Sequence, residues 1–175
     1  MSLHLVDPAL VQARLRGDFA DLVDTLYRAD KPPDQELRPA FEVMARATFV
    51  FLPKRQMHPE GLMYCRAVEY LLRTLGNQRW EVEFYPDEGE APLWELAFGR
   101  CEASWLDLPQ SESGIGIISW KSPDTCRSYA WEIQDGRRQN TYNPRYSPSV
   151  TLEECLAALE AGHRSGHGLF VIFQG

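Results

Sequence analysis

Six acidic side chains between residues 81 and 95 are the residues of this sequence best placed to do chemistry. Glu81 and Glu83 alternate along a stretch of β-strand character, and Glu95 follows in the next apolar stretch. Residues two apart on a strand point to one face, about 7 Å from each other. That spacing suits a pair of catalytic carboxylates, one with a raised pKa, or a divalent-ion site. The acids between them are Asp87, Glu88 and Glu90.

The same acidic cluster supports two further interpretations. Like charges at the tip of a hairpin repel one another, and a cationic partner would relieve that repulsion and be steered onto the surface. Acidic residues on an exposed strand also occur simply as a solvated face. EF-hand spacing is absent from Asp87, Glu88 and Glu90. We therefore favour a docking surface, and keep the catalytic pair and the solvated face as alternatives.

Motifs for nucleotide binding and nucleophilic catalysis are missing. The glycines of residues 114–116 lie in a strand-like run, without the third glycine and the helix that a dinucleotide site requires. The four cysteines are widely spaced, as expected of buried apolar side chains. His163 and His167, with Cys155 upstream, have the spacing of a zinc-binding helix, but neighbouring glycines predict a turn there. We expect no metal and no cofactor.

The charge balance indicates the kind of partner. The net charge is −7, from 25 acidic against 18 basic residues, and no Lys/Arg cluster of the kind that binds phosphate backbones is present. Nucleic acids and anionic membranes are therefore not expected partners, whereas a basic protein is. The sequence shows neither a signal peptide nor about 18 consecutive apolar residues, and its unpaired cysteines suit a reducing cytoplasm.

Helical periodicity dominates the first 76 residues. Asp7 and Pro8 form a helix start, with a capping carboxylate followed by a proline at the first helical position. Apolar residues then recur at spacings of three and four, and breaks occur at prolines and at Gly76. The three predicted helices cover residues 7–27, 35–51 and 62–75.

Alternating patterns follow and predict strands. A last helix, with a capping box at Thr151 and Glu154, is predicted to end at Gly162. The apolar run that closes the chain is predicted to lie in the middle of the sheet. The predicted strands cover residues 80–85, 94–98, 114–120, 128–134 and 168–173.

These elements predict one α+β domain spanning residues 1–175. The expected sheet is mostly antiparallel, with about five strands. The expected helices, three N-terminal and one near the C-terminus, pack on one face of it.

The favoured function is a small acidic cytoplasmic protein that binds and occludes a basic partner, as a bacterial immunity protein or antitoxin-like inhibitor does. The alternative is a small enzyme that uses Glu81, Glu83 and Glu95 for acid–base or metal-assisted hydrolysis. Aromatic and arginine side chains in nearby loops would supply the centre of an interface. The expected partner-binding residues are Glu83, Tyr85, Asp87, Glu88, Glu90, Trp105, Tyr142, Arg145 and Tyr146.

Overall fold

The described part of the chain consists of helices and short strands in an α+β arrangement. The computed structural model describes residues 1–16, 23–24, 27–28, 32, 34–39, 57–58, 61–83, 91–99, 101–103, 110–111, 116–139, 141–142 and 149–174. Its strands are β1 (Ser2–Leu5), β2 (Met57–His58), β3 (Gln78–Glu81), β4 (Gln110–Ser111), β5 (Gly116–Lys121) and β6 (Leu169–Gln174). Its helices are α1 (Pro8–Arg16), the 3-10 helix η1 (Gln35–Leu37), α4 (Gly61–Leu75), α5 (Ala91–Phe98), α6 (Pro123–Gln139) and α7 (Ser149–Ser165).

The main sheet has four antiparallel strands in the order β3-β1-β6-β5. The apolar strand β6 lies between β1 and β5, as its sequence predicts. β1 was not predicted, because four residues of mixed character carry little periodicity. A second, two-stranded parallel sheet joins β2 and β4.

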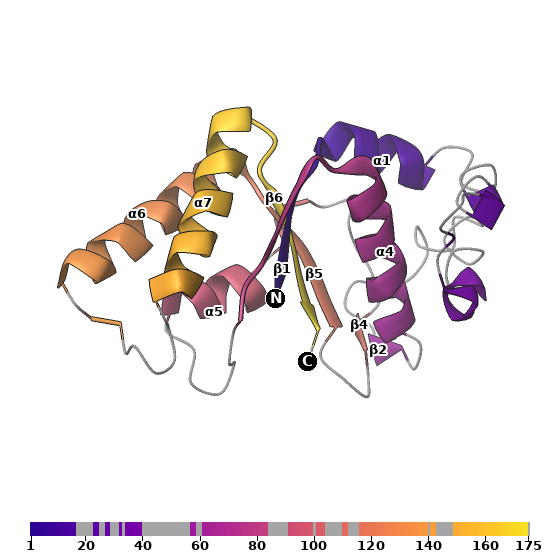
Figure 1. Cartoon of the computed structure of the whole chain (residues 1–175), viewed down its shortest axis with the longest axis horizontal. Coiled ribbons are helices and arrows are strands. Elements are labelled where there is room, and N and C mark those ends of the chain that lie inside the picture. The colour runs from indigo at the N-terminus through magenta and orange to yellow at the C-terminus, as the bar shows by residue number, and fades with distance from the viewer. Residues whose placement is uncertain are drawn as a thin grey trace.

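Helices cover both faces of the main sheet, and not one face as predicted. Figure 1 shows α5, α6 and α7 on one side of the strands, and α1 and α4 on the other. Side chains alternate accordingly along β1: Leu3 joins the core beneath α7, whereas His4 lies beside Glu69 of α4. β6 is hydrophobic on both of its faces, so the sheet can bury apolar side chains against helices on either side.

A hydrophobic core lies between the sheet and α5, α6 and α7. It includes Leu3, Val82, Leu93, Leu96, Cys126, Ala130, Ile133, Leu152, Cys155, Leu156, Ala158, Leu159, Leu169 and Val171.

The predicted N-terminal helices are confirmed where the structure describes them. Asp7 Oδ1 accepts a hydrogen bond from Ala9 N at the start of α1, as the cap requires. The Gly76 amide closes α4 by donating to Leu72 O. Within the segment predicted as the second helix, η1 and residues 38–39 are helical, and residues 40–51 lie outside the described residues.

The strand predicted at residues 94–98 is wrong, because this segment forms α5. Leu93, Leu96 and Ala97 are buried at the three- and four-residue spacing of a helix, while Trp94 is exposed. Pro92 falls in the first turn, where its missing N–H has no cost.

The strand predicted at residues 128–134 is also wrong, because it lies within α6. Ser122 Oγ accepts from Thr125 N and Pro123 starts the helix, a capping signal of the same kind as Asp7-Pro8. The buried positions are Cys126, Ala130 and Ile133.

The last predicted helix is confirmed with different ends. α7 begins before Thr151 and continues past Gly162 to Ser165. Gly162 is needed inside the helix because an added Cβ would lie 2.8 Å from Leu169 Cγ. The glycines that end the segment are Gly166 and Gly168, both with positive φ.

Candidate functional site

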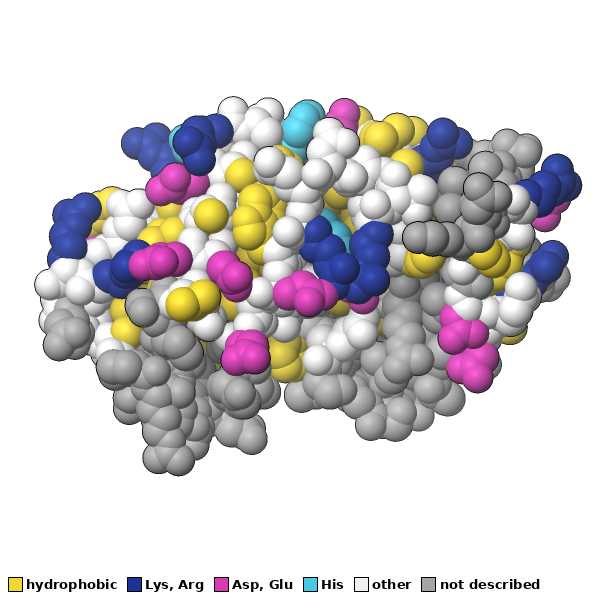
Figure 2. Space-filling view, viewed as in Figure 1, with side chains coloured by type: hydrophobic (Ala, Val, Ile, Leu, Met, Phe, Trp, Pro, Cys, Tyr) yellow, Lys and Arg dark blue, Asp and Glu magenta, His cyan; other side chains and the backbone are white. Residues whose placement is uncertain are grey.

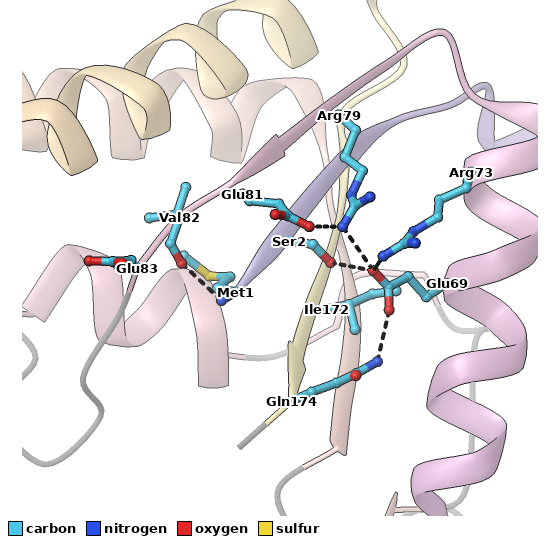
Figure 3. Close-up of a pocket in the computed structure, with 10 residues that line it drawn as sticks. All are labelled: Met1, Ser2, Glu69, Arg73, Arg79, Glu81, Val82, Glu83, Ile172 and Gln174. Carbon is cyan, nitrogen blue, oxygen red and sulfur yellow. Dashed lines mark hydrogen bonds and ion pairs between the residues drawn. The ribbon is translucent and has the colours of Figure 1, made fainter.

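An open groove of about 490 Å³ runs over β1, β3 and β6 beside α4. Figure 2 shows basic side chains gathered near the middle of this face, next to acidic ones. Figure 3 shows that Arg73 and Arg79 point toward Glu69, while Glu83 lies at the other end of the groove. The groove is lined by Met1, Ser2, Glu69, Arg73, Arg79, Glu81, Val82, Glu83, Ile172 and Gln174.

Glu69 is the centre of the polar contacts in the groove. Its side chain is 12% exposed. Oε1 accepts from Arg73 Nη2 at 2.6 Å and from Ser2 Oγ at 3.3 Å, and Oε2 accepts from Gln174 Nε2 at 2.9 Å. Arg79 Nη2 lies 3.6 Å from Oε1 and also donates to Glu81. One carboxylate therefore ties α4 to β1, β3 and β6.

The Glu69 carboxylate is held in its charged form. Burial works to raise its pKa, but the hydrogen bond and charge of Arg73, together with the charge of Arg79, outweigh burial and leave the pKa below its usual value. Burial, with the nearby charge of Arg73, lowers the pKa of Arg79. The groove is therefore an ion-pair network in which the described arginines are matched to carboxylates.

His4 lies beneath this network and is 1% exposed. Its Nε2 is 3.2 Å from Ser2 Oγ and 4.0 Å from Glu69 Oε1. Burial lowers the pKa of His4 to about 4, which the charge of Glu69 only partly opposes. His4 is thus a neutral side chain near pH 7, and its Nε2–H is placed to donate to the Ser2 hydroxyl, which donates onward to Glu69.

Replacing Glu69 with alanine is expected to lower the free energy of unfolding by about 2–3 kcal/mol at pH 7. The change removes three hydrogen bonds and leaves Arg73 and Arg79 close together without their shared carboxylate. Glu153→Ala is the matched control, because Glu153 pairs with Arg137 at 3.0 Å on the exposed surface and should cost under about 1 kcal/mol. Urea unfolding followed by circular dichroism measures both. Equal losses would contradict the central role of Glu69.

The predicted carboxylates are only partly brought together. Glu81 and Glu83 line the groove, and Glu81 pairs with Arg79. Glu95 does not join them, because it lies on α5, on the opposite side of the sheet, and not on the strand predicted at residues 94–98. Its Oε2 is instead 3.5 Å from Tyr129 Oη, which donates to it.

Of the other predicted interface residues, Tyr142 is the one that lies within the described part of the chain. Tyr142 follows the end of α6, where it is half-buried and its ring packs against Gly136. The remaining members lie outside the described residues, so their predicted role stays a prediction: Tyr85, Asp87, Glu88, Glu90, Trp105, Arg145 and Tyr146.

The histidines near the C-terminus are used for structural contacts. His163 Nδ1 lies 3.1 Å from Pro123 O and so links the end of α7 to the start of α6. His167 Nδ1 lies 3.9 Å from Asp7 Oδ1. Among the described residues, no three His, Cys, Asp or Glu side chains are grouped so as to hold a metal ion.

The buried thiols are poorly suited to act as nucleophiles. Burial raises the pKa of Cys65, Cys126 and Cys155 to about 12 in each case. A thiol with such a pKa carries almost no thiolate at neutral pH.

Lys121 is a buried cation that the sequence did not single out. Its Nζ donates to Glu95 O at 3.4 Å, in the last turns of α5, where helix carbonyls attract positive charge. Burial lowers the pKa of Lys121, and the negative charge of Glu102 opposes that shift. This arrangement ties β5 to α5 and lies on the side of the sheet opposite the groove.

Comparison with known proteins gives one partial similarity. Over 94 residues the chain is 35% identical to the ribosome biogenesis protein ERB1 of Mycosarcoma maydis; this segment is 51% of the chain and 8% of that protein. The chain therefore spans less than a tenth of the length of this relative, and the similarity does not define a family. No family model matches the sequence, and no solved structure matches it.

The helices were also compared with the requirements of a membrane span. Within the described ranges, none combines the length and the apolar character needed to cross a bilayer.

Proposed function

We propose that this chain binds a more basic protein and blocks it by occlusion, as an immunity protein or antitoxin-like inhibitor does. The observation that supports this proposal is the exposure of Glu83 and its lack of a partner among the described residues. Glu83 is exposed at one end of the groove, and no hydrogen bond or ion pair reaches it from the described residues, whereas Glu69 and Glu81 are both paired with arginine. An unpaired carboxylate beside a groove is a place for a cationic side chain of a partner.

The proposed surface extends from Glu83 into the acidic segment that follows it along the chain. Asp87, Glu88 and Glu90 would add to the negative field that steers a basic partner, and Tyr85 and Trp105 would supply the apolar anchor of the interface. Tyr142, Arg145 and Tyr146 would form a separate part of the contact, because Tyr142 lies beyond the end of α6.

We place this activity in the cytoplasm, as part of the proposal. All four cysteines are free, and three are buried. Free thiols are the usual state of cysteines in a reducing compartment.

Reversing the charge at Glu83, Glu88 and Glu90 to lysine is expected to slow association with the partner about 10-fold at low salt. The partner is obtained by capture on the immobilised chain and is then purified, so that association is measured by surface plasmon resonance at several salt concentrations. The expected partner is basic, and its own activity falls when the chain binds.

Glu154→Lys is the control for each of these reversals made singly, because Glu154 is an exposed carboxylate on α7 and its reversal changes the net charge by the same amount elsewhere. It is expected to leave the association rate close to that of the unmodified chain. A partner whose activity is unaffected by binding, or an association rate insensitive to the reversals and to salt, would rule out the proposed inhibition.

A further inference from the structure

β3 is an edge of the main sheet, and among the described strands none pairs with its side away from β1. Met1 and Val82 exchange both backbone hydrogen bonds, at 2.8 and 2.9 Å. Hydrogen-bonded and non-hydrogen-bonded pairs alternate in an antiparallel ladder, so the backbone N–H and C=O groups of Arg79 and Glu81 turn away from β1. Within the described ranges no group hydrogen-bonds these four atoms.

The opposite edge of the sheet differs from β3. At β5, the Glu102 amide donates to Trp120 O at 3.0 Å, so part of that edge is covered. An edge strand with exposed backbone groups readily pairs with another strand. β3 is therefore the described edge at which a further strand can add.

The charged side chains of β3 can pair with those of a second β3 that runs antiparallel to it. Arg79 and Glu81 lie two residues apart on the groove side of the sheet. If a second β3 runs antiparallel with Trp80 opposite Trp80, then Arg79 lies opposite Glu81 of the second copy, and Glu81 opposite Arg79. Both positions are those whose backbone groups face outward, so each is a hydrogen-bonded pair as well as an ion pair.

The neighbouring register is disfavoured. Centring the pairing on Glu81 would place two copies of Glu81 directly opposite each other, and like charges across a strand pair are destabilising. A twofold axis at Trp80 is thus the arrangement that the charges select, and twofold pairing of one surface with itself is the commonest form of dimer.

We propose that β3 pairs with β3 of a second copy of this chain, in antiparallel orientation about Trp80, and joins the two four-stranded sheets edge to edge. This inference does not depend on the proposed function. The segments that follow Glu83 would leave the joined strands at opposite ends, so each copy would keep its own acidic surface. Because β3 is only four residues long, the contact is small and we expect a dissociable dimer.

The test is analytical ultracentrifugation of the purified chain between about 5 and about 200 µM, the range in which a small interface dissociates. We expect the unmodified chain to change from monomer to dimer over this range. Arg79→Glu and Glu81→Arg are each expected to weaken the dimer about 10-fold or more, because each places like charges opposite each other twice.

An equimolar mixture of the Arg79→Glu and Glu81→Arg variants is the decisive sample. In the mixed dimer every charged pair is again between opposite charges, so dimerisation is expected to return. Mixing cannot repair a folding defect in either variant, and this separates the proposed pairing from a loss of the Arg79–Glu69 contact.

Arg127→Glu is the matched control, because Arg127 is exposed on α6 and its reversal changes the net charge by the same amount. It is expected to leave dimerisation unchanged. The proposal is overturned by a chain that stays monomeric throughout, by single variants that dimerise as well as the unmodified chain, or by a mixture that stays monomeric. A monomeric chain whose edge instead accepts a strand of a different protein would also overturn it.

Discussion

Replacing Gly168 with alanine is expected to lower the free energy of unfolding by about 3–4 kcal/mol. Gly168 has φ +72°, a conformation that side chains with a Cβ adopt at a cost of about 1–2 kcal/mol. The added Cβ would also lie 2.2 Å from the backbone oxygen of Lys121 and 3.1 Å from the Trp120 ring. The Lys121 oxygen belongs to the backbone and cannot move aside as a side chain can. The turn before β6 would therefore have to move away from β5.

Gly166→Ala is the control for the backbone part of this loss. Gly166 has nearly the same φ, +74°, but nothing lies within 4 Å of the position its Cβ would take. Its substitution is therefore expected to cost about 1 kcal/mol. Urea unfolding of both variants gives the difference, which is the cost of crowding alone. Equal losses at the two positions would show that the close approach of Lys121 is not limiting.

The Gly168 turn also matters for the groove. It follows α7 and brings the chain into β6, and its amide donates to Gly162 O at 3.0 Å. β6 places Ile172 and Gln174 in the groove and provides one of the three hydrogen bonds to Glu69. A displaced β6 would therefore loosen the candidate site, although Gly168 itself does not line it.

The two strands predicted where helices form, at residues 94–98 and 128–134, are errors with one physical origin. A short apolar segment with spacings of two, three and four fits both a strand and a helix. Trp94, Leu96 and Phe98 alternate as in a strand, but Leu93, Leu96 and Ala97 are the buried set. In α6, Trp131 is 62% exposed, while Cys126, Ala130 and Ile133 are the buried residues. The capping side chains of Asp7 and Ser122 coincide with the starts of α1 and α6, because a cap specifies the backbone directly whereas an apolar pattern specifies only a face. The capping box predicted at Thr151 lies inside α7.

The candidate site was less predictable than the fold. Its central group, Glu69, becomes notable only when α4 lies against β1 and β6, which no local pattern specifies. One local signal was available: Glu69 and Arg73 are four apart on a helix, the spacing of an ion pair. Arg79 and Gln174 are 95 residues apart in the chain and reach the same groove from different strands. Their proximity therefore depends on the order of the strands in the sheet.

Stability is expected to fall by about 2 kcal/mol between pH 7.5 and pH 5 because of His4 alone. The pKa of His4 is lowered by burial from 6.5 to about 4 in the folded protein. Above pH 6.5 His4 is neutral whether the chain is folded or not, so it contributes no pH dependence. As the pH falls below 6.5 the unfolded chain binds a proton that the folded chain does not, and the loss approaches about 3 kcal/mol near pH 4.

The groups around His4 determine how this loss can be separated from others. Glu69 favours the charged imidazole, whereas Arg79 and Arg73 oppose it. Glu69 itself has a lowered pKa, so its own contribution is lost only below its usual value of 4.5, at lower pH than that of His4. Burial also lowers the pKa of the Met1 amino group from its usual value of 8.0, so this group contributes over the same pH range. The histidine is therefore isolated by comparing the urea unfolding of the unmodified chain with that of a variant that lacks the His4 ring.

His4→Gln is the variant that removes the titrating ring while keeping a polar side chain that can reach Ser2. Between pH 7.5 and pH 5, the free energy of unfolding of this variant is expected to fall by about 2 kcal/mol less than that of the unmodified chain. The imidazole resonances of His4 in the folded protein, followed by NMR, are expected to titrate near pH 4. Parallel loss of stability in the two proteins, or titration of His4 near 6.5, would mean that the ring is hydrated in the folded state, and the network of Ser2 and Glu69 above it would then be open to solvent.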